Sequence, residues 1–575
     1  MDEAKQATQV RESREALLRE VLLKEFGGMD AATWETLVPR IRWLQMGAGD
    51  VLCREGEPAD TMYVVLSGRL RASRASEGVE RAVGEISRGE TVGEMALLAG
   101  GVRGATVRAM RDCVLAGLDR AGFVELARFS PESVLRVAQI QMQRLQRANL
   151  PPSPFKKHLC LAIYPADPTC DSVAFARDLH GEISARTRAS LAEAEGAPSG
   201  GGTAADERHR TALWLNEQEA ATDIFIMACG GNDSVWSRQC LRHADLILLA
   251  ARPGSTPEVP AGIIPPGIPR TLVVLHPDGK TEPQGTATAM AACGAAAHFH
   301  LRQNTPADLR RLGRLLTGNA NGIAFAGGGA RSFAHLGVLN ALEAHGIPVD
   351  LAAGTSLGAI VAAGLAIDLN LVDLMKRFRI MVKANPTKRD YLLLPRTSFL
   401  SGRKLDRLLP QLLPNRDIED CWKDFSCVSA NITHPSAHVH SSGSLLRALR
   451  ATVSIPGVFP PVQLEDGDLL VDGGVVNNLP ADILRNRGAG RLIACDQGGP
   501  APNGEMPNAI AIIMRSVVLQ SRISGRAWRT AADLYFESPV SDISLLEWDK
   551  FDLAVQRGYE NAKRCLENVD PSAWQ

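Results

Sequence analysis

The sequence has few aromatic residues and no excess of charge of either sign. Aromatic residues make up 5% of its 575 residues, and Lys+Arg 63 against Asp+Glu 64 give a formal net charge of −1. Non-specific nucleic-acid binding needs a basic surface, so we expect no nucleic-acid partner. The hydrophobic fraction of 45% and the charged fraction of 22% exclude a collagen-like, coiled-coil or wholly disordered chain. We therefore expect a globular protein of three or four domains.

The sequence also lacks Cys-x-x-Cys pairs, a signal peptide and long apolar runs. Its 11 cysteines are an odd number, which indicates free thiols in a reducing compartment and argues against a cysteine-ligated zinc site. The start of the chain is polar. The longest weakly polar run, residues 351–367, is shorter than the ~20 residues of a spanning helix and is interpreted as a buried core helix. These features predict a cytoplasmic protein without a signal peptide or transmembrane segment, whose membrane contact, if any, is peripheral.

Residues 30–150 are rich in short strands. Met62–Leu66, Val83–Ile86 and Cys113–Leu115 are apolar runs between glycines and charges, a pattern typical of a β-roll or barrel. Residues 131–148 have helical spacing, and the prolines after Leu150 predict a linker over 151–157. Residues 1–29 are expected to form a leader helix.

Residues 158–318 alternate apolar strands with helical stretches, which predicts a Rossmann-like α/β domain with a parallel sheet. No glycine-rich phosphate loop follows any of these strands, so a structural or docking role is expected. The expected strands are Leu159–Ile163, Ile224–Met227, Leu246–Ala250 and Leu272–Leu275.

Residues 319–500 form a further α/β domain with strands expected at Ile323–Ala326, Val349–Ala353 and Arg491–Cys495. The remaining residues, 501–575, are expected to form a helical extension. Its large aromatic side chains are expected to pack in the core rather than meet lipid; they are Trp528, Tyr535 and Trp548.

A serine motif follows the second of these strands and opens an alanine-rich helix. Gly354-Thr355-Ser356-Leu357-Gly358 has the strand–turn–helix context of a nucleophile elbow. The turn lifts the Ser356 hydroxyl from the backbone, and the helix N-terminus favours developing negative charge. The alternative is a plain strand–turn–helix without chemistry.

A glycine-rich turn follows the first strand and reads Gly327-Gly328-Gly329-Ala330-Arg331-Ser332. Consecutive glycines allow backbone N–H groups to face an anion at a helix start. Either a dinucleotide phosphate loop or an oxyanion hole would use such a turn, and the nearby serine motif favours the oxyanion hole. Arg331 would contact the oxyanion or a phosphate head group, or would be an ordinary surface arginine.

Asp472 ends a strand and is followed by two glycines. A serine nucleophile needs a base, and hydrolases of the elbow type place a histidine after the aspartate. No histidine follows His440, so the simplest hypothesis is a dyad of Ser356 and Asp472. The histidines His434, His438 and His440 are expected to form a strand cluster without a catalytic role, a metal site being the alternative; no metal is expected.

These motifs, in this order, resemble the patatin-like phospholipases, and most closely their neuropathy target esterase branch. Ser454-Ile455-Pro456-Gly457 and Asn477-Asn478-Leu479-Pro480 extend the resemblance. It implies an α/β/α hydrolase domain that cleaves phospholipid or lysophospholipid esters without a required cofactor. Ser356 would be the nucleophile and Asp472 the general base; the oxyanion hole would comprise Gly327, Gly328, Gly329 and Arg331. Ser332 departs from the glycine usual in the family.

The N-terminal β-roll resembles a cyclic-nucleotide-binding domain. Gly93-Glu94-Met95-Ala96-Leu97 and Val102-Arg103-Gly104-Ala105-Thr106-Val107 align with the phosphate cassette of such domains, except at Val102 and Gly104. The resemblance implies a site for cyclic AMP or cyclic GMP. In it Glu94 binds the ribose and Arg103 the phosphate; Gly93, Ala105 and Thr106 complete the set. The alternative is a β-roll that binds no nucleotide and only docks on the hydrolase domain.

Two motifs of the middle segment also resemble the esterase branch: Trp214-Leu215-Asn216-Glu217-Gln218-Glu219 and Cys240-Leu241-Arg242-His243-Ala244-Asp245. Taken together, the motifs and the resemblances predict a serine esterase that acts on lysophospholipids and phospholipids and has a cyclic nucleotide as its effector. A cyclic-nucleotide-sensing scaffold with an idle hydrolase site and a lipid acyltransferase are the alternatives. A transcription factor is disfavoured, since no helix-turn-helix follows the β-roll.

Overall fold

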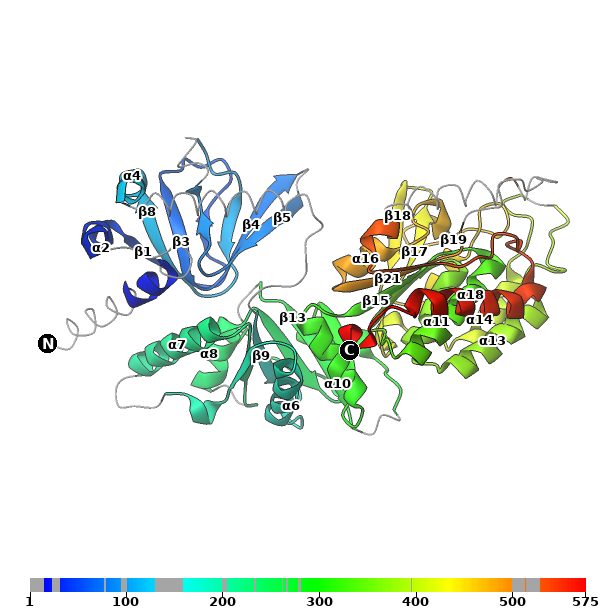
Figure 1. Ribbon diagram of the computed structural model, residues 1–575, viewed down its shortest axis with the longest axis horizontal. Coiled ribbons are helices and arrows are strands. Elements are labelled where there is room, and N and C mark those ends of the chain that lie inside the picture. The colour runs from blue at the N-terminus through cyan, green and yellow to red at the C-terminus, as the bar shows by residue number, and fades with distance from the viewer. Residues whose placement is uncertain are drawn as a thin grey trace. The chain divides into compact units, whose positions relative to one another are not determined.

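The computed structural model describes residues 15–22, 31–76, 79–94, 101–129, 159–198, 204–231, 234–260, 262–264, 267–277, 281–394, 396–498, 512 and 528–575. The chain divides into two compact units. The first comprises residues 1–152, 157–250 and 258–271, and the second comprises residues 153–156, 251–257 and 272–575. Figure 1 shows the β-roll in blue and the C-terminal α/β domain in green to red.

The first unit begins with the expected β-roll, built from two antiparallel four-stranded sheets. One sheet has the order β1 (Arg42–Met46), β8 (Cys113–Asp119), β3 (Thr61–Ser67) and β6 (Thr91–Val92). The other has the order β2 (Val51–Cys53), β7 (Thr106–Ala109), β4 (Leu70–Ser76) and β5 (Val79–Ile86). Helix α2 (Ala31–Leu37) precedes the roll and α4 (Arg120–Phe129) follows it.

Part of the predicted N-terminal organisation can be compared with the structure. Residues 15–22 are helical, within the expected leader helix, whereas residues 1–14 and 23–30 lie outside the described residues. The helix expected over 131–148 and the linker over 151–157 also lie outside them.

The middle segment contributes a parallel sheet to the first unit, as predicted. The strands are β10 (Ala189–Ala192), β11 (Ile224–Ala228), β9 (Leu159–Pro165) and β12 (Leu246–Ala251), in this order across the sheet. The helices are α6 (Ser172–Ser184), α7 (Ala204–Ala221) and α8 (Val235–His243). Strands β11, β9 and β12 are almost wholly buried, because helices cover the faces of a parallel sheet, whereas β10 is only partly buried.

The two middle-segment motifs contact the β-roll within this first unit. Arg111, two residues before β8, forms a buried ion pair with Glu219, and its Nε lies 3.3 Å from Asp245 Oδ1. Arg69 Nη2 lies 3.0 Å from Asp245 Oδ2. Burial alone would raise the pKa of Glu219, but the Arg111 charge lowers it well below its usual range. These ion pairs join the two motifs to the β-roll, and the structural or docking role expected for the middle segment stays a prediction.

The second unit begins near β13 (Arg270–His276) and β14 (Ala297–Arg302), with α9 (Thr286–Cys293) and α10 (Pro306–Leu316). An eight-stranded sheet follows. Its order is β19 (Val462–Gln463), β20 (Leu469–Asp472), β17 (Asp424–Asn431), β16 (Leu351–Thr355), β15 (Asn321–Phe325), β21 (Arg491–Asp496) and β22 (Leu534–Glu537), with β18 (Ser436–His440) beside β17. The five strands from β17 to β22 are parallel.

Side chains alternate between the two faces of this sheet, as strand geometry requires. On β15, Ile323 and Phe325 enter one core, whereas Ala324 enters the other. The first core is formed with α11 (Ala334–His345), α12 (Leu357–Ala366), α13 (Leu371–Ala384), α14 (Arg403–Leu412), α15 (Leu445–Thr452) and α18 (Phe551–Leu566). The second core contains residues of α16 (Ala481–Asn486), on the opposite side of the labelled strands from α11 (Figure 1). This three-layer arrangement is the predicted α/β/α fold.

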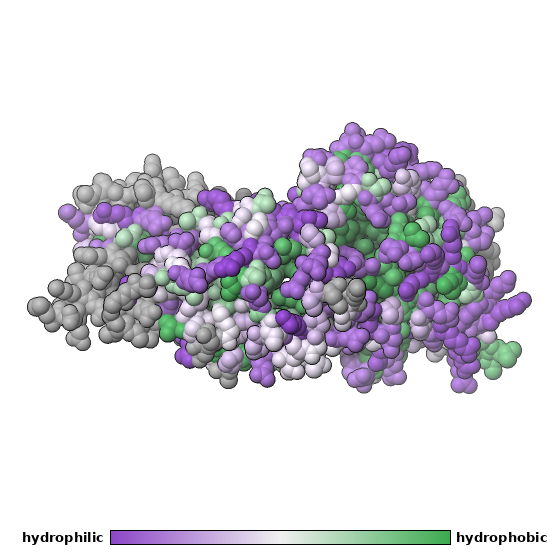
Figure 2. Space-filling view, turned by 90° about the horizontal axis from the view of Figure 1, so that it is seen from below, coloured by the Kyte–Doolittle hydropathy of each residue, from purple (hydrophilic) through white to green (hydrophobic). Residues whose placement is uncertain are grey.

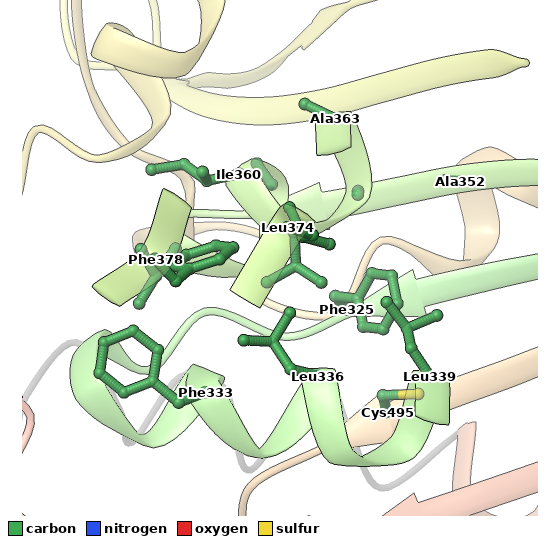
Figure 3. Packing of buried hydrophobic residues seen from close by; sticks show 14 of the residues in the cluster. Phe325, Phe333, Leu336, Leu339, Ala352, Ile360, Ala363, Leu374, Phe378 and Cys495 are labelled. Atoms are coloured by element: carbon green, nitrogen blue, oxygen red, sulfur yellow. The ribbon is translucent and has the colours of Figure 1, made fainter. Parts of the chain in front are cut away.

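The first core packs aromatic and aliphatic side chains closely. Figure 3 shows Phe333 of the turn before α11 beside Phe378 of α13, with Leu336 next to them. The rings of Phe333 and Phe378 are 5.9 Å apart in an edge-to-face arrangement. Edge-to-face contacts of this kind stabilise a core beyond simple burial.

Two expectations for this unit need correction. Residues 351–367 are not one core helix but strand β16 followed by α12, because the chain turns at Ser356. The C-terminal extension is not wholly helical, because β22 joins the sheet beside β21. The expected core role is confirmed for Trp548, which is 7% exposed, and Trp528 and Tyr535 pack partly buried against the second core.

The surface and the cysteines agree with the composition. The face shown in Figure 2 is mainly hydrophilic, with hydrophobic residues between the hydrophilic ones. All cysteines are free thiols, and only Cys565 is exposed. Among the described helices, none has the length and apolar character to cross a bilayer.

Candidate active site

Ser356 occupies a sharp turn between strand β16 and helix α12. Its φ is 53° and its ψ is −131°, a conformation that costs energy in a residue with a side chain. The flanking glycines permit the turn. A Cβ on Gly354 would lie 2.6 Å from Ala359 Cα, and one on Gly358 would lie 2.6 Å from the carbonyl oxygens of Phe325 and Ala326. Glycine is therefore required on both sides of Ser356, because a side chain at either position would collide with neighbouring backbone atoms.

Asp472 faces Ser356 from the end of strand β20. Ser356 Oγ donates a hydrogen bond of 2.6 Å to Asp472 Oδ2, and the Gly474 N–H donates one of 2.8 Å to Oδ1. Ser356 is 7% exposed and Asp472 is 2% exposed. Burial raises the pKa of Asp472 to about 6, although the two hydrogen bonds oppose the rise. The structure thus brings together the two residues predicted to form the dyad.

The glycine turn lies beside this pair. A Cβ on Gly327 would come within 2.9 Å of Ser356 Cβ. The Gly327 N–H donates to the Asn478 carbonyl at 3.3 Å, and the Ala330 N–H donates to the Leu545 carbonyl at 2.8 Å. Within the described residues, no backbone partner is assigned to the N–H groups of Gly328 and Gly329. These two N–H groups are the candidate oxyanion donors.

The Arg331 side chain contacts the C-terminal extension. Its Nε donates to the Ile543 carbonyl at 2.6 Å, and its Nη2 donates to the Ser541 carbonyl at 2.8 Å. The buried guanidinium therefore anchors the C-terminal extension against the glycine turn. These two hydrogen bonds use the Nε and Nη2 donors of Arg331, and its assignment to the oxyanion hole stays a prediction.

Three polar residues that hold the site were not predicted from the sequence. The Thr452 hydroxyl accepts from the Ser356 N–H at 3.0 Å and donates to the Val428 carbonyl. The Asn478 side chain donates to the Gly327 carbonyl at 3.0 Å. The third residue is Gln497, at the end of β21.

The Gln497 amide lies directly behind the glycine turn. Its Nε2 is 2.8 Å from the Ala326 carbonyl oxygen and 2.9 Å from Ser332 Oγ. A Cβ on Gly328 would lie 1.7 Å from Gln497 Oε1, so only glycine fits the turn at this position without displacing the amide. The Ser332 hydroxyl is buried and is hydrogen-bonded by Gln497 instead of facing Ser356.

The three histidines after the serine motif lie on or beside the β17–β18 hairpin. His440 Nε2 is 2.9 Å from Ser429 Oγ, and its ring is 4.6 Å from that of His438. His434 Nδ1 is 2.9 Å from Asp468. Among the described residues, the group with metal-ligand geometry is a different one, Cys160, Glu219 and His243, and there Glu219 is already paired with Arg111.

Of the predicted nucleotide-binding residues, the structure brings Gly93 and Arg103 together in the β-roll. Arg103 is 7% exposed and Glu94 is 2% exposed. Arg103 Nη2 donates to the Thr61 carbonyl at 2.8 Å, whereas Nη1 is buried with no hydrogen-bond partner among the described residues. A Cβ on Gly93 would lie 1.9 Å from Arg103 Nη1. Thr106 Oγ1 accepts from the Glu55 N–H, and the Ala105 carbonyl lies 4.0 Å from Cys53 Sγ.

Three family models match successive parts of the chain. The cyclic nucleotide-binding domain matches residues 43–128, and the Neuropathy Target Esterase family P-loop like domain matches residues 158–312. The patatin-like phospholipase model matches residues 323–485, which contain Ser356 and Asp472. The chain therefore contains a patatin-like phospholipase domain, and its middle segment is similar to a domain of the neuropathy target esterase family.

Relatives of this branch are similar over most of the chain. The human patatin-like phospholipase domain-containing protein 6 is 32% identical over 80% of this chain and 38% of its own length. The Drosophila melanogaster protein neuropathy target esterase sws is 30% identical over 79% and 36%. The mouse patatin-like phospholipase domain-containing protein 7 is 28% identical over 91% and 45%. The chain thus spans less than half of each relative.

Among solved structures, the regulatory domain of Toxoplasma gondii PKA with cAMP is similar to part of the chain. It has 29% sequence identity over 22% of this chain and 49% of that chain, with a TM-score of 0.20.

Replacement of Gln497 by leucine is expected to lower kcat of the patatin domain by about 10- to 100-fold with KM nearly unchanged, because the glycine turn loses the amide that fixes it. Leucine keeps a similar volume and removes both polar atoms. Steady-state kinetics on a soluble ester separates the two constants. Ser332→Gly, which restores the family residue, is the control and is expected to keep kcat within a few-fold. An equal effect of both substitutions, or a change in KM alone, would contradict this positioning role.

Proposed function

We propose that the protein is a serine esterase that hydrolyses the acyl ester bonds of lysophospholipids and phospholipids. The observation that carries the proposal is the hydrogen bond of 2.6 Å between Ser356 Oγ and the buried Asp472 carboxylate, beside a glycine turn. The match of this domain to the patatin-like phospholipase model supports a lipid substrate.

In the proposed first step, Ser356 Oγ attacks the acyl carbonyl and its proton passes to Asp472 Oδ2. The N–H groups of Gly328 and Gly329 and the N-terminus of α12 stabilise the oxyanion of the tetrahedral intermediate. When this intermediate collapses, the C–O bond to the glycerol breaks and the leaving alkoxide takes the proton from Asp472. An acyl ester of Ser356 remains.

In the second step, Asp472 accepts a proton from water as the water oxygen attacks the acyl-enzyme. Collapse of the second intermediate releases the fatty acid and returns the proton to Ser356 Oγ. A pKa of about 6 makes Asp472 a stronger base than an ordinary aspartate while leaving it mostly ionised at neutral pH. The dyad therefore needs no third residue to activate the serine.

We also propose that a cyclic nucleotide is the effector of the β-roll. The buried Nη1 of Arg103 without a partner in the described part of the chain suits a cyclic phosphate. The ion pairs of Arg111 and Arg69 with the middle segment provide a contact through which a bound nucleotide would act on the rest of the first unit.

One experiment tests both proposals: lysophosphatidylcholine is incubated with the purified protein, with and without cyclic AMP or cyclic GMP, and with an added alcohol. We expect fatty acid and glycerophosphocholine in equal amounts and a rate that depends on one nucleotide. A fatty-acyl ester of the added alcohol as main product would identify an acyltransferase instead. Absence of any product over a panel of ester lipids would favour the sensing scaffold.

A further inference from the structure

An apolar loop tip projects from the patatin domain between helices α13 and α14, which are labelled in Figure 1. The consecutive residues Tyr391, Leu392, Leu393 and Leu394 are 69%, 40%, 101% and 81% exposed. Single exposed apolar residues are normal on a protein surface, but a contiguous group marks an interaction site. Two leucines exposed to this extent have almost no contact with the rest of the chain.

The base of this loop is fixed by hydrogen bonds. Asp390 Oδ1 accepts from Ser401 Oγ at 2.6 Å, and Oδ2 accepts from the Gly402 N–H at 2.9 Å. The Leu392 N–H donates to the Phe399 carbonyl at 2.9 Å. Trp548 Nε1 donates to Thr387 Oγ1 at 3.2 Å. These hydrogen bonds fix the backbone on either side of the leucines, whose side chains are exposed to solvent.

The same loop is connected to the segment that contacts the catalytic aspartate. The Phe399 N–H donates to the Gly457 carbonyl at 2.8 Å, and the Leu400 N–H donates to the Val458 carbonyl at 2.9 Å. A few residues earlier, the Ser454 carbonyl accepts from the Asp472 N–H at 2.8 Å. A short run of backbone thus joins the loop to the candidate active site.

Basic residues flank the apolar tip on both sides in the sequence. Residues 383–404 contain six Lys or Arg residues and a single acidic residue, Asp390, which is engaged at the loop base. Three of the cations are exposed within six residues of the leucines: Lys388, Arg389 and Arg396. Apolar side chains flanked by cations are the pattern by which proteins bind anionic lipid surfaces.

We propose that residues 388–394, with the neighbouring Arg396, form a membrane-binding loop that inserts Leu393 and Leu394 into an anionic phospholipid bilayer. The proposal rests on the proposed lipid esterase function, since it assigns the surface from which the Ser356 site takes its substrate. A protruding tip suits a deformable lipid surface better than a protein groove, and the basic flanks supply the charge complementarity.

The binding test uses the full chain with Ser356→Ala, so that vesicles are not hydrolysed. Cosedimentation is measured with phosphatidylcholine vesicles and with vesicles that also contain phosphatidylserine. We expect stronger binding to the anionic vesicles, weakened by salt. The pair Leu393→Asp and Leu394→Asp is expected to weaken this binding at least tenfold. Val372→Asp, at a residue of α13 that is 63% exposed, is the matched control and should bind unchanged.

A second measurement separates this proposal from the esterase proposal. With Ser356 present, the double leucine variant should hydrolyse a monomeric short-chain lysophospholipid at the wild-type rate and a vesicle substrate at least tenfold more slowly. Binding by the Ser356→Ala protein is informative even if the wild type hydrolyses nothing. Unchanged vesicle binding by the leucine variant, or a dimer of the wild type that this variant dissociates, would overturn the membrane assignment.

Discussion

Replacement of Asp472 by asparagine is expected to remove esterase activity by about a thousandfold or more and at the same time to make the patatin domain more stable at neutral pH. Asparagine has the same shape. Its oxygen can accept from the Gly474 N–H and its amide can donate to Ser356 Oγ, so both hydrogen bonds of the native carboxylate survive. The substitution removes the general base, which lowers the activity, and it removes a buried negative charge, which raises the stability.

The sign of the stability change follows from linkage. Burial raises the pKa of Asp472 from its unfolded value of 3.8 to about 6. A group with a raised folded pKa stabilises the fold fully only below its unfolded pKa, and this contribution is lost as the pH rises through the folded pKa. At pH 7.5 the ionised Asp472 therefore costs about 3 kcal/mol relative to a neutral residue. That cost disappears as the pH falls to about 4.

Thermal unfolding checks this prediction. The transition of the patatin domain should shift upward by several degrees in Asp472→Asn at pH 7.5 and much less at pH 4.5. Ser356→Ala is the matched control because it also removes activity but leaves the carboxylate buried with one hydrogen bond fewer. It should be no more stable than the wild type. An active asparagine variant would show that Asp472 is not the base. A variant less stable than the wild type at pH 7.5 would show that the buried charge of Asp472 does not destabilise the fold.

Local patterns in the sequence were sufficient to predict that Ser356 and Asp472 lie together as a candidate dyad, and to predict strands of the sheet that carries them. Ser356 and Asp472 both lie in short motifs in which only glycine fits at certain positions for steric reasons. Each motif can therefore be recognised in the sequence without knowing that the other lies beside it in the fold. The parallel strands could be predicted for a similar reason: the central residues of β15 and β21 are buried on both faces and form continuous apolar runs. Strand β22 was missed because it joins the sheet at its edge.

The supporting residues could not be predicted because their roles depend on contacts between distant segments. Gln497 reaches the glycine turn from β21, and Arg331 leaves that turn to bind the C-terminal extension. Two signals were available: Asn478 lies within the Asn477-Asn478-Leu479-Pro480 motif, and Thr452 precedes the Ser454-Ile455-Pro456-Gly457 motif. A single sequence shows which residues can do chemistry, whereas the residues that hold them are identified by packing.

The pH dependence of kcat/KM is expected to report Asp472 directly. The dyad is active only when this carboxylate is ionised, so kcat/KM should be constant above pH 7 and fall tenfold per pH unit below about 6. An aspartate with its ordinary pKa would place this fall about two pH units lower. At pH 4 the difference between the two cases approaches 100-fold, and stopped-time assays with a soluble ester can measure it.

A histidine base would titrate in the same range, so the group must be identified. Burial lowers the pKa of His335 to about 4 and that of His440 to about 3, which removes both as the source of a transition near pH 6. The temperature dependence of the kinetic pKa distinguishes a carboxylate base from any other histidine base, because carboxyl ionisation has a small enthalpy and imidazole ionisation has a large one. The measured pKa should therefore stay in place between 15 and 35 °C. A pKa that falls on warming, or a profile flat down to pH 5, would assign the base to another group and leave the Ser356–Asp472 hydrogen bond as a structural contact.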